Sequence, residues 1–139
     1  MSDGNVLVDT GPLVAIFSTQ DAHHKVCVDQ LRSIDPPMFT CWPVITEAIW
    51  LLRGYSGAAQ KLLRCFADGG LLRIVSLNGN DVPRIARIME NYANLGAQLA
   101  DAALVHLAER ENLRTIFTLD RRDFSVYRLS RNRRLHLIP

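Results

Sequence analysis

Short apolar runs alternate with longer amphipathic segments along this chain, and that alternation constrains its fold most. Runs of strand-forming residues occupy 6–9, 38–41, 71–77 and 115–118, and 135–138 is a candidate last strand. Segments with helical spacing of apolar residues separate these runs. Strands that alternate with helices favour a mainly parallel sheet with helices on both faces. We therefore predict an α/β fold.

The helical segments are predicted from their caps and breakers. Six helices are expected. The first is short and begins at Pro12, and the others run from Asp21 to about Ser33, Pro43 to Gly54, Ser56 to about Ala67, Asp81 to about Tyr92, and Gln98 to Glu111. No repeat, low-complexity tract or Pro/Gly/Ser linker divides the chain, so residues 1–139 are expected to form a single domain. No apolar run approaches the roughly 18 residues of a membrane span. The start, MSDGNVLVD, does not have the pattern of a signal peptide.

The cysteines indicate a reducing compartment. Cys27, Cys41 and Cys65 are odd in number and show no CxxC spacing. Such residues are more often small buried apolar groups than metal ligands or redox centres. We therefore expect free thiols and a cytoplasmic protein.

Four acidic residues stand where an exposed charge is not expected. Asp9 and Asp120 follow predicted strands, whereas Glu47 and Asp101 each have apolar residues three and four positions further along a predicted helix. Taken singly, each acid could be a helix cap, a turn residue or a surface group. Together they are harder to explain locally, because burying an unpaired carboxylate is costly. Since the carboxyl ends of parallel strands meet at one edge of a sheet, we expect Asp9 and Asp120 to converge there.

A divalent cation would relieve the repulsion among such carboxylates. Clustered acids raise one another's pKa, and Mg²⁺ and Mn²⁺ prefer oxygen ligands. Metal sites of this kind activate water for phosphodiester cleavage. Thr10 and Thr118 lie beside predicted site acids and could orient the carboxylates.

Four motifs, in this order and spacing, resemble the PIN-domain ribonucleases, and most of all the VapC-type toxins of bacterial toxin–antitoxin pairs. The motifs are LVDTGPL around Asp9, VITEAIWLL around Glu47, LADAALVHLAE around Asp101 and IFTLDRRDF around Asp120. The resemblance implies a three-layer α/β/α fold and a Mg²⁺- or Mn²⁺-dependent endoribonuclease acting on single-stranded RNA. It also implies a cognate antitoxin and a homodimer. These four acids would be the catalytic and metal-binding residues, with Asp123 as the alternative to Asp120.

The C-terminal segment is strongly basic. Residues 121–139 contain six arginines and one acid, whereas residues 1–120 contain 10 basic and 13 acidic residues. A basic segment beside an acidic body favours a polyanionic partner. The residues expected to contact RNA are Arg121, Arg122, Arg131, Arg133 and Arg134.

Other functions fit the sequence less well. A phosphatase or receiver domain of flavodoxin-like type also places an aspartate after its first strand. The phosphatase needs a second aspartate at the position of Gly11, and both classes need a lysine just after a later strand, which Lys25 and Lys61 do not provide. A stand-alone RNA-processing nuclease and a non-catalytic binding module on the same fold remain alternatives. Trp42 and Trp50 could stack RNA bases, but we expect both to pack between helices.

Overall fold

The protein contains one five-stranded parallel sheet. A computed structural model describes residues 4–139, and its strands lie in the order β3-β2-β1-β4-β5. The strands are β1 (Val6–Val8), β2 (Met38–Thr40), β3 (Leu72–Ile74), β4 (Thr115–Phe117) and β5 (His136–Ile138). All four pairings are parallel. The predicted α/β fold is confirmed, including the last strand, while β3 is shorter than the run 71–77.

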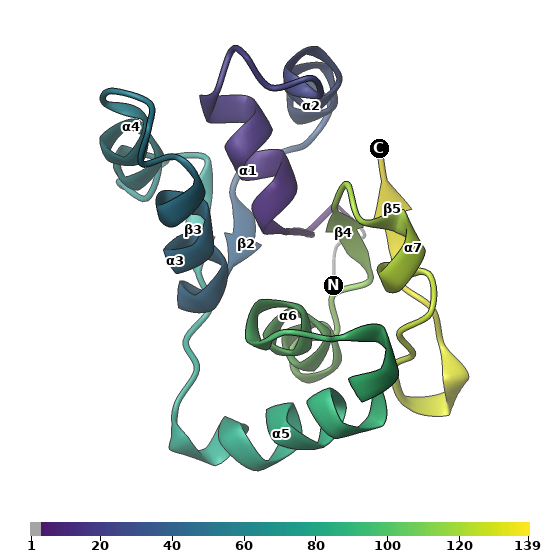
Figure 1. The fold of residues 1–139 in the computed structure, drawn as a ribbon. Helices are drawn as coiled ribbons and strands as arrows, with labels where there is room; N and C mark the ends of the chain where they lie inside the picture. Colours follow the sequence, from purple (N-terminus) through teal and green to yellow (C-terminus); the bar gives the residue numbers. More distant parts are fainter. Residues whose placement is uncertain (1–3) are drawn as a thin grey trace.

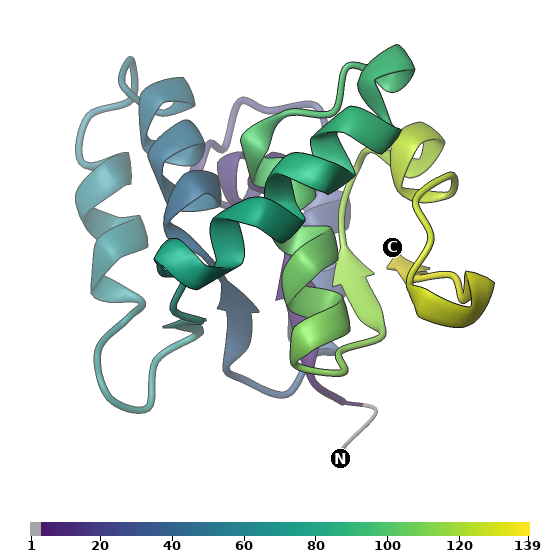
Figure 2. The same cartoon turned by 90° about the horizontal axis from the view of Figure 1, so that it is seen from below.

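Helices cover both faces of this sheet. They are α1 (Thr10–Phe17), α2 (His24–Arg32), α3 (Trp42–Leu51), α4 (Ala58–Arg64), α5 (Val82–Asn91), α6 (Leu99–Arg110) and α7 (Arg121–Phe124). In Figure 1, α1 and α2 lie on one side of the sheet and α5 and α6 on the other. Figure 2 shows α5 crossing the outer surface of α6. The arrangement is the predicted three-layer α/β/α fold.

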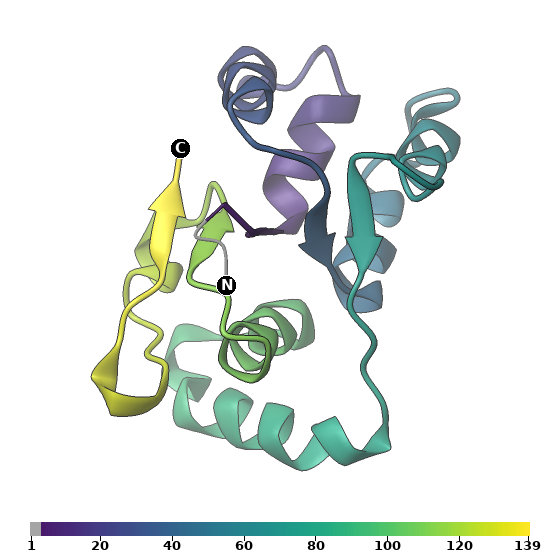
Figure 3. The same cartoon turned by 180° about the vertical axis from the view of Figure 1, so that it is seen from behind.

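The two central strands come from opposite ends of the chain. Leu7 of β1 pairs with Ile116 of β4, and both side chains are fully buried. β3 and β5 form the two edges, as Figure 3 shows from behind. Small side chains in α6, such as Ala102 and Ala103, are also fully buried and let this helix pack closely. Consecutive buried residues in β1 and β4 are typical of parallel strands covered on both faces.

A buried polar network ties α6 to the segment that enters α5. The Oδ1 atom of Asp81 is 2.7 Å from Nε2 of His106 and accepts a hydrogen bond from Arg110 at 3.0 Å. The His106 contact, then the amide of Asn78 and the guanidinium of Arg110, hold the pKa of Asp81 well below its usual range. His106 therefore has a structural role here, and the carboxylate that it contacts lies outside the predicted acid cluster.

The positions of the two tryptophans differ from our expectation. Trp42 and Trp50 of α3 are 58% and 62% exposed, so the prediction that both pack between helices is wrong. α3 is apolar around most of its circumference, and its buried side is formed by Val44, Ile45 and Ala48. The three cysteines are free thiols, as predicted. Within residues 4–139, no helix has the length and apolar character needed to cross a bilayer.

Candidate active site

Six carboxylates line one cavity of about 590 Å³. They belong to Asp9, Asp21, Glu47, Asp101, Asp120 and Asp123. Asp9 directly follows β1, and Asp120 follows β4, so both stand at the carboxyl edge of the sheet. The structure thus brings together all five acids expected from the sequence and adds a sixth.

Asp9 is the most buried of these acids and is held by hydrogen bonds on both oxygens. It is only 7% exposed. It caps α1 by accepting a hydrogen bond from the Thr10 amide at 2.8 Å, and the Thr118 hydroxyl donates to its other oxygen at 2.9 Å. Both threonines therefore orient this carboxylate, although Thr10 does so through its backbone. The hydroxyl of Thr10 instead lies 3.5 Å from the Val44 carbonyl oxygen.

Burial raises the pKa of Asp9 from 3.8 to about 6. The two hydrogen bonds oppose this shift, while the charges of Asp101 and Glu47 add to it. The pKa of Asp9 is therefore about 6, and a raised carboxyl pKa of this kind is typical of groups at functional sites.

Asp101 enters the cavity from the first turn of α6. Its Oδ2 accepts a hydrogen bond from the Gln98 amide at 3.2 Å, which is one half of a capping box. Burial raises the pKa of Asp101, and the charges of Asp120, Glu47 and Asp123 raise it further. This carboxylate is thus both a helix cap and a member of the acid cluster.

Asp120 and Asp123 share the corner between β4 and α7. Asp120 caps α7, because its Oδ1 accepts a hydrogen bond from the Asp123 amide at 3.0 Å. The Asp123 Oδ1 atom is buried without a hydrogen-bond partner, although Nε of Arg122 lies 3.6 Å away. One oxygen of Asp123 is therefore available for a further donor or a cation.

Asp21 lines the same cavity and was missed as a site residue, because its sequence pattern predicts only a helix N-cap. The helix α2 begins at His24, three residues later than that interpretation requires. Asp21 instead accepts a hydrogen bond from the His23 amide at 2.8 Å in the turn before the helix. No apolar neighbour pattern distinguishes it, and only the folded chain brings it to the cavity.

The donor set fits a hard divalent cation. Within residues 4–139, the side chains that line this cavity include six carboxylates and no lysine, arginine or histidine. No three His, Cys, Asp or Glu side chains in that part of the chain are yet close enough together to hold an ion. Carboxylates without a counter-charge repel one another. A divalent cation would neutralise part of this negative charge.

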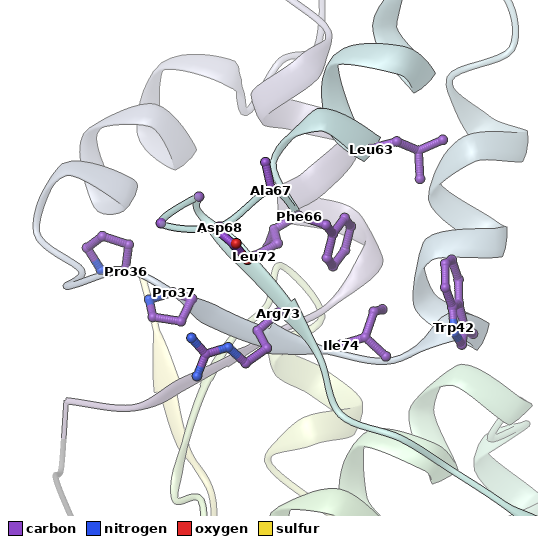
Figure 4. Close-up of a pocket in the computed structure, with 12 residues that line it drawn as sticks. Pro36, Pro37, Trp42, Leu63, Phe66, Ala67, Asp68, Leu72, Arg73 and Ile74 are labelled. Atoms are coloured by element: carbon purple, nitrogen blue, oxygen red, sulfur yellow. The ribbon is translucent and has the colours of Figure 1, made fainter.

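A second cavity, of about 410 Å³, lies beside the edge strand β3 (Figure 4). Its walls are mostly apolar, with Phe66 and Leu63 on one side and Pro36 and Pro37 on the other. Among residues 4–139, Asp68 and Arg73 are the charged residues that line it, one of each sign. This cavity therefore lacks a cluster of like charges, and the acid cavity is the candidate active site.

The family model for the PIN domain matches residues 6–129, which include all six acids. The chain belongs to the PIN-domain family. It is 32% identical over 136 residues to ribonuclease VapC26 of Mycobacterium tuberculosis, covering 96% of this chain and all of that protein.

A solved structure supports the same fold for this PIN domain. The crystal structure of VapC20, a sarcin–ricin loop cleaving toxin of Mycobacterium tuberculosis, superposes with a TM-score of 0.71. The sequences are 17% identical, and the match covers 81% of this chain and 87% of the other. The predicted PIN-like architecture is therefore confirmed.

The arginines that were predicted to contact RNA form two groups in this PIN domain. Arg121 and Arg122 begin α7, beside the acid cavity, and both are exposed. Arg131, Arg133 and Arg134 precede β5, whose first residue pairs with the first residue of β4. They therefore lie toward the opposite, amino edge of the sheet.

Arg133 has partners within the protein. Its guanidinium is 3.3 Å from Oε2 of Glu109, and Ser130 contacts both of these side chains. Arg121 also donates to the backbone carbonyl of Pro139. These contacts leave Arg122, Arg131 and Arg134 as the more accessible members of the set predicted to contact RNA.

Proposed function

We propose that this PIN domain, residues 1–139, is a divalent-cation-dependent endoribonuclease and the toxin of a toxin–antitoxin pair. Single-stranded RNA would be its substrate, and the cytoplasm its location. Within residues 4–139, six carboxylates converge in one cavity whose lining includes no basic residue, and this convergence carries the proposal. Its similarity to ribonuclease VapC26 over 96% of the chain supports the same activity.

Asp9, Glu47, Asp101 and Asp120 would hold Mg²⁺ or Mn²⁺ in this cavity. When bound, such an ion supplies a Lewis acid that lowers the pKa of water and neutralises charge on a phosphodiester. Asp9 is fixed for this task by Thr10 and Thr118. Without a cation, the negative cavity repels RNA phosphates, so the ion is needed for substrate binding as well.

Removal of divalent cations tests this function directly. A single-stranded RNA substrate is incubated with the purified protein, first with EDTA and then with excess Mg²⁺ or Mn²⁺. We expect cleavage to stop with EDTA and to return with either ion. A Glu47→Gln variant purified in parallel controls for contaminating nucleases. Cleavage that persists in EDTA, or equally in this variant, would contradict the proposal.

The roles of Asp120 and Asp123 are expected to differ. We propose that Asp120, the nearer of the two to the end of β4, binds the ion directly and that Asp123 acts through a bound water. Mg²⁺ usually keeps several of its waters, so a water-mediated role is reasonable. Asp120→Asn should therefore reduce the cleavage rate more than Asp123→Asn does. Rates measured across a Mn²⁺ titration decide this, and a larger loss with weaker metal affinity in Asp123→Asn would reverse the assignment.

The two groups of arginines are expected to respond differently to RNA length. We propose that Arg121 and Arg122 hold the phosphates nearest the cavity, while Arg131, Arg133 and Arg134 contact longer RNA. For a short single strand, replacing Arg121 and Arg122 by alanine should reduce the salt slope of binding by about 1.4, at roughly 0.7 for each contact. Replacing Arg131 and Arg134 should change it only with longer RNA. If all variants bind RNA with the same salt slope as the wild type, these arginines do not contact RNA.

An exposed apolar face adjoins the acid cavity and is proposed to form the homodimer. This face consists of Trp42, Trp50, Leu51 and Leu99. A cavity of about 540 Å³ within it shares Glu47 and Gln98 with the acid cavity. Contiguous exposed apolar surface typically marks a protein interface. In sedimentation experiments, Trp50→Glu should yield monomers. The control variant Val82→Glu, on α5, should remain a dimer. A monomeric wild type would contradict the proposed dimer. A cognate antitoxin is the second proposed protein partner.

A further inference from the structure

The hydroxyl of Tyr127 is buried without a partner among residues 4–139. Tyr127 is 1% exposed, and within this part of the chain its hydroxyl makes no hydrogen bond. Its ring is fixed by edge-on contacts with Tyr92 and Phe124, at centroid distances of 4.9 and 5.0 Å. An unsatisfied buried polar group costs stability. The absence of a partner for this hydroxyl therefore calls for an explanation.

The backbone places Tyr127 on the same side of its turn as Asp123. The Tyr127 amide donates to the Asp123 carbonyl at 3.2 Å, the spacing of one helical turn beyond the end of α7. Residues four apart in such a turn lie on a common face. Asp123 also carries the buried oxygen, Oδ1, which has no hydrogen-bond partner within the described part of the chain and lies 3.6 Å from Nε of Arg122. A buried donor and a buried acceptor thus lie on one face of the same turn.

The electrostatic surroundings of the hydroxyl point to the acid cluster. Burial raises the pKa of Tyr127, and the charges of Asp101, Asp123, Asp120 and Asp9 raise it further, in that order. The phenol therefore stays protonated and remains a hydrogen-bond donor within the field of several acceptors. Tyr127 itself does not line the cavity, so it can act on the site only through another side chain.

We propose that Tyr127 is a positioning residue whose hydroxyl donates a hydrogen bond to Oδ1 of Asp123 when the cavity binds its divalent cation. This inference rests on the proposed function, because the bound ion draws the carboxylates into the arrangement in which the hydrogen bond forms. The hydroxyl would then fix the orientation of Asp123. Loss of an outer-shell group such as Asp123 typically costs a factor of about 10 to 100 in metal affinity, and the hydroxyl, one contact further from the ion, contributes a smaller factor.

Tyr127→Phe tests the proposal, because it removes only the hydroxyl. Mn²⁺ affinity is measured by electron paramagnetic resonance, and unfolding is followed with EDTA present. We expect Mn²⁺ to bind up to about 10-fold more weakly, with an unchanged or higher melting temperature in EDTA. Tyr92→Phe is the matched control: its hydroxyl accepts from the Arg128 amide at 3.0 Å, so this variant should lose stability but keep its Mn²⁺ affinity.

A double-mutant cycle separates positioning from packing. In an Asp123→Ala background, which has no acceptor for the hydroxyl, Tyr127→Phe should weaken Mn²⁺ binding much less than it does in the wild type. If Tyr127→Phe does not fold, Mg²⁺ added to the wild type should instead produce a slowly exchanging hydroxyl proton of Tyr127 in NMR spectra. Unchanged Mn²⁺ affinity in Tyr127→Phe, or no such resonance, would overturn this inference alone. A wild type that binds no Mn²⁺ would overturn the proposed function and this inference with it.

Discussion

Asp101→Asn is expected to abolish RNA cleavage without weakening the fold. The substitution removes a charged ligand, and direct ligands should matter more than their supporting groups, so we expect a loss of more than about 100-fold. The asparagine oxygen can still accept the hydrogen bond from the Gln98 amide that caps α6. Because the native protein raises the pKa of Asp101, its charge destabilises the fold when no cation is bound.

Stability and activity should therefore separate in this variant. In EDTA, Asp101→Asn should melt at the same temperature as the wild type or higher, whereas Mg²⁺ should stabilise the wild type more than the variant. Asp68→Asn is the control, since Asp68 is an exposed acid of the other cavity. A large loss of stability in EDTA for Asp101→Asn would mean that its carboxylate supports the fold rather than a metal site.

The protein without divalent cations is expected to lose stability as the pH rises from about 4 to about 6. The pKa of Asp9 increases from 3.8 in the unfolded chain to about 6 in the fold. The folded state therefore binds the proton of Asp9 more tightly than the unfolded chain does. The stabilisation that results is fully present below a pH of 3.8. By the time the pH has risen through about 6, about 3 kcal/mol of unfolding free energy is lost.

Urea unfolding in EDTA across this pH range measures the effect, and Asp9→Asn should remove most of it. The affinity for divalent cations should change in the opposite direction and increase with pH, because the cation must displace the proton from Asp9. Below a pH of about 6, Mg²⁺ affinity should fall roughly tenfold for each pH unit. A wild type whose unfolding free energy follows that of Asp9→Asn at every pH would contradict the assigned burial of this carboxylate.

The sequence predicted the part of the site that depends on strand ends and helix faces. Asp9 and Asp120 end parallel strands, so their convergence follows from the fold class. Glu47 and Asp101 were identified because apolar neighbours surround them. Asp21 could not be identified this way, since its local role in a turn accounts fully for its presence.

Other features depend on packing that no local pattern records. α3 is apolar on most sides, so the sequence could not indicate which side Trp42 and Trp50 occupy. The short helix α7 was not expected, because four residues carry too little periodicity. Arg133 could not be distinguished from the other arginines, since its partner Glu109 lies 24 residues earlier in the chain.

The pairing of β1 with β4 also sets when this protein can become active during its synthesis. The hydrogen bond from Thr118 to Asp9 joins residues 109 positions apart. At usual rates of translation, a ribosome needs roughly 5 to 20 s to make that length of chain. A growing chain that ends before β4 has neither the central strand pair nor the acids that follow it. Under the proposed function, nascent protein cannot cleave nearby RNA until almost all of it has emerged, which leaves an interval in which the proposed antitoxin can be present first.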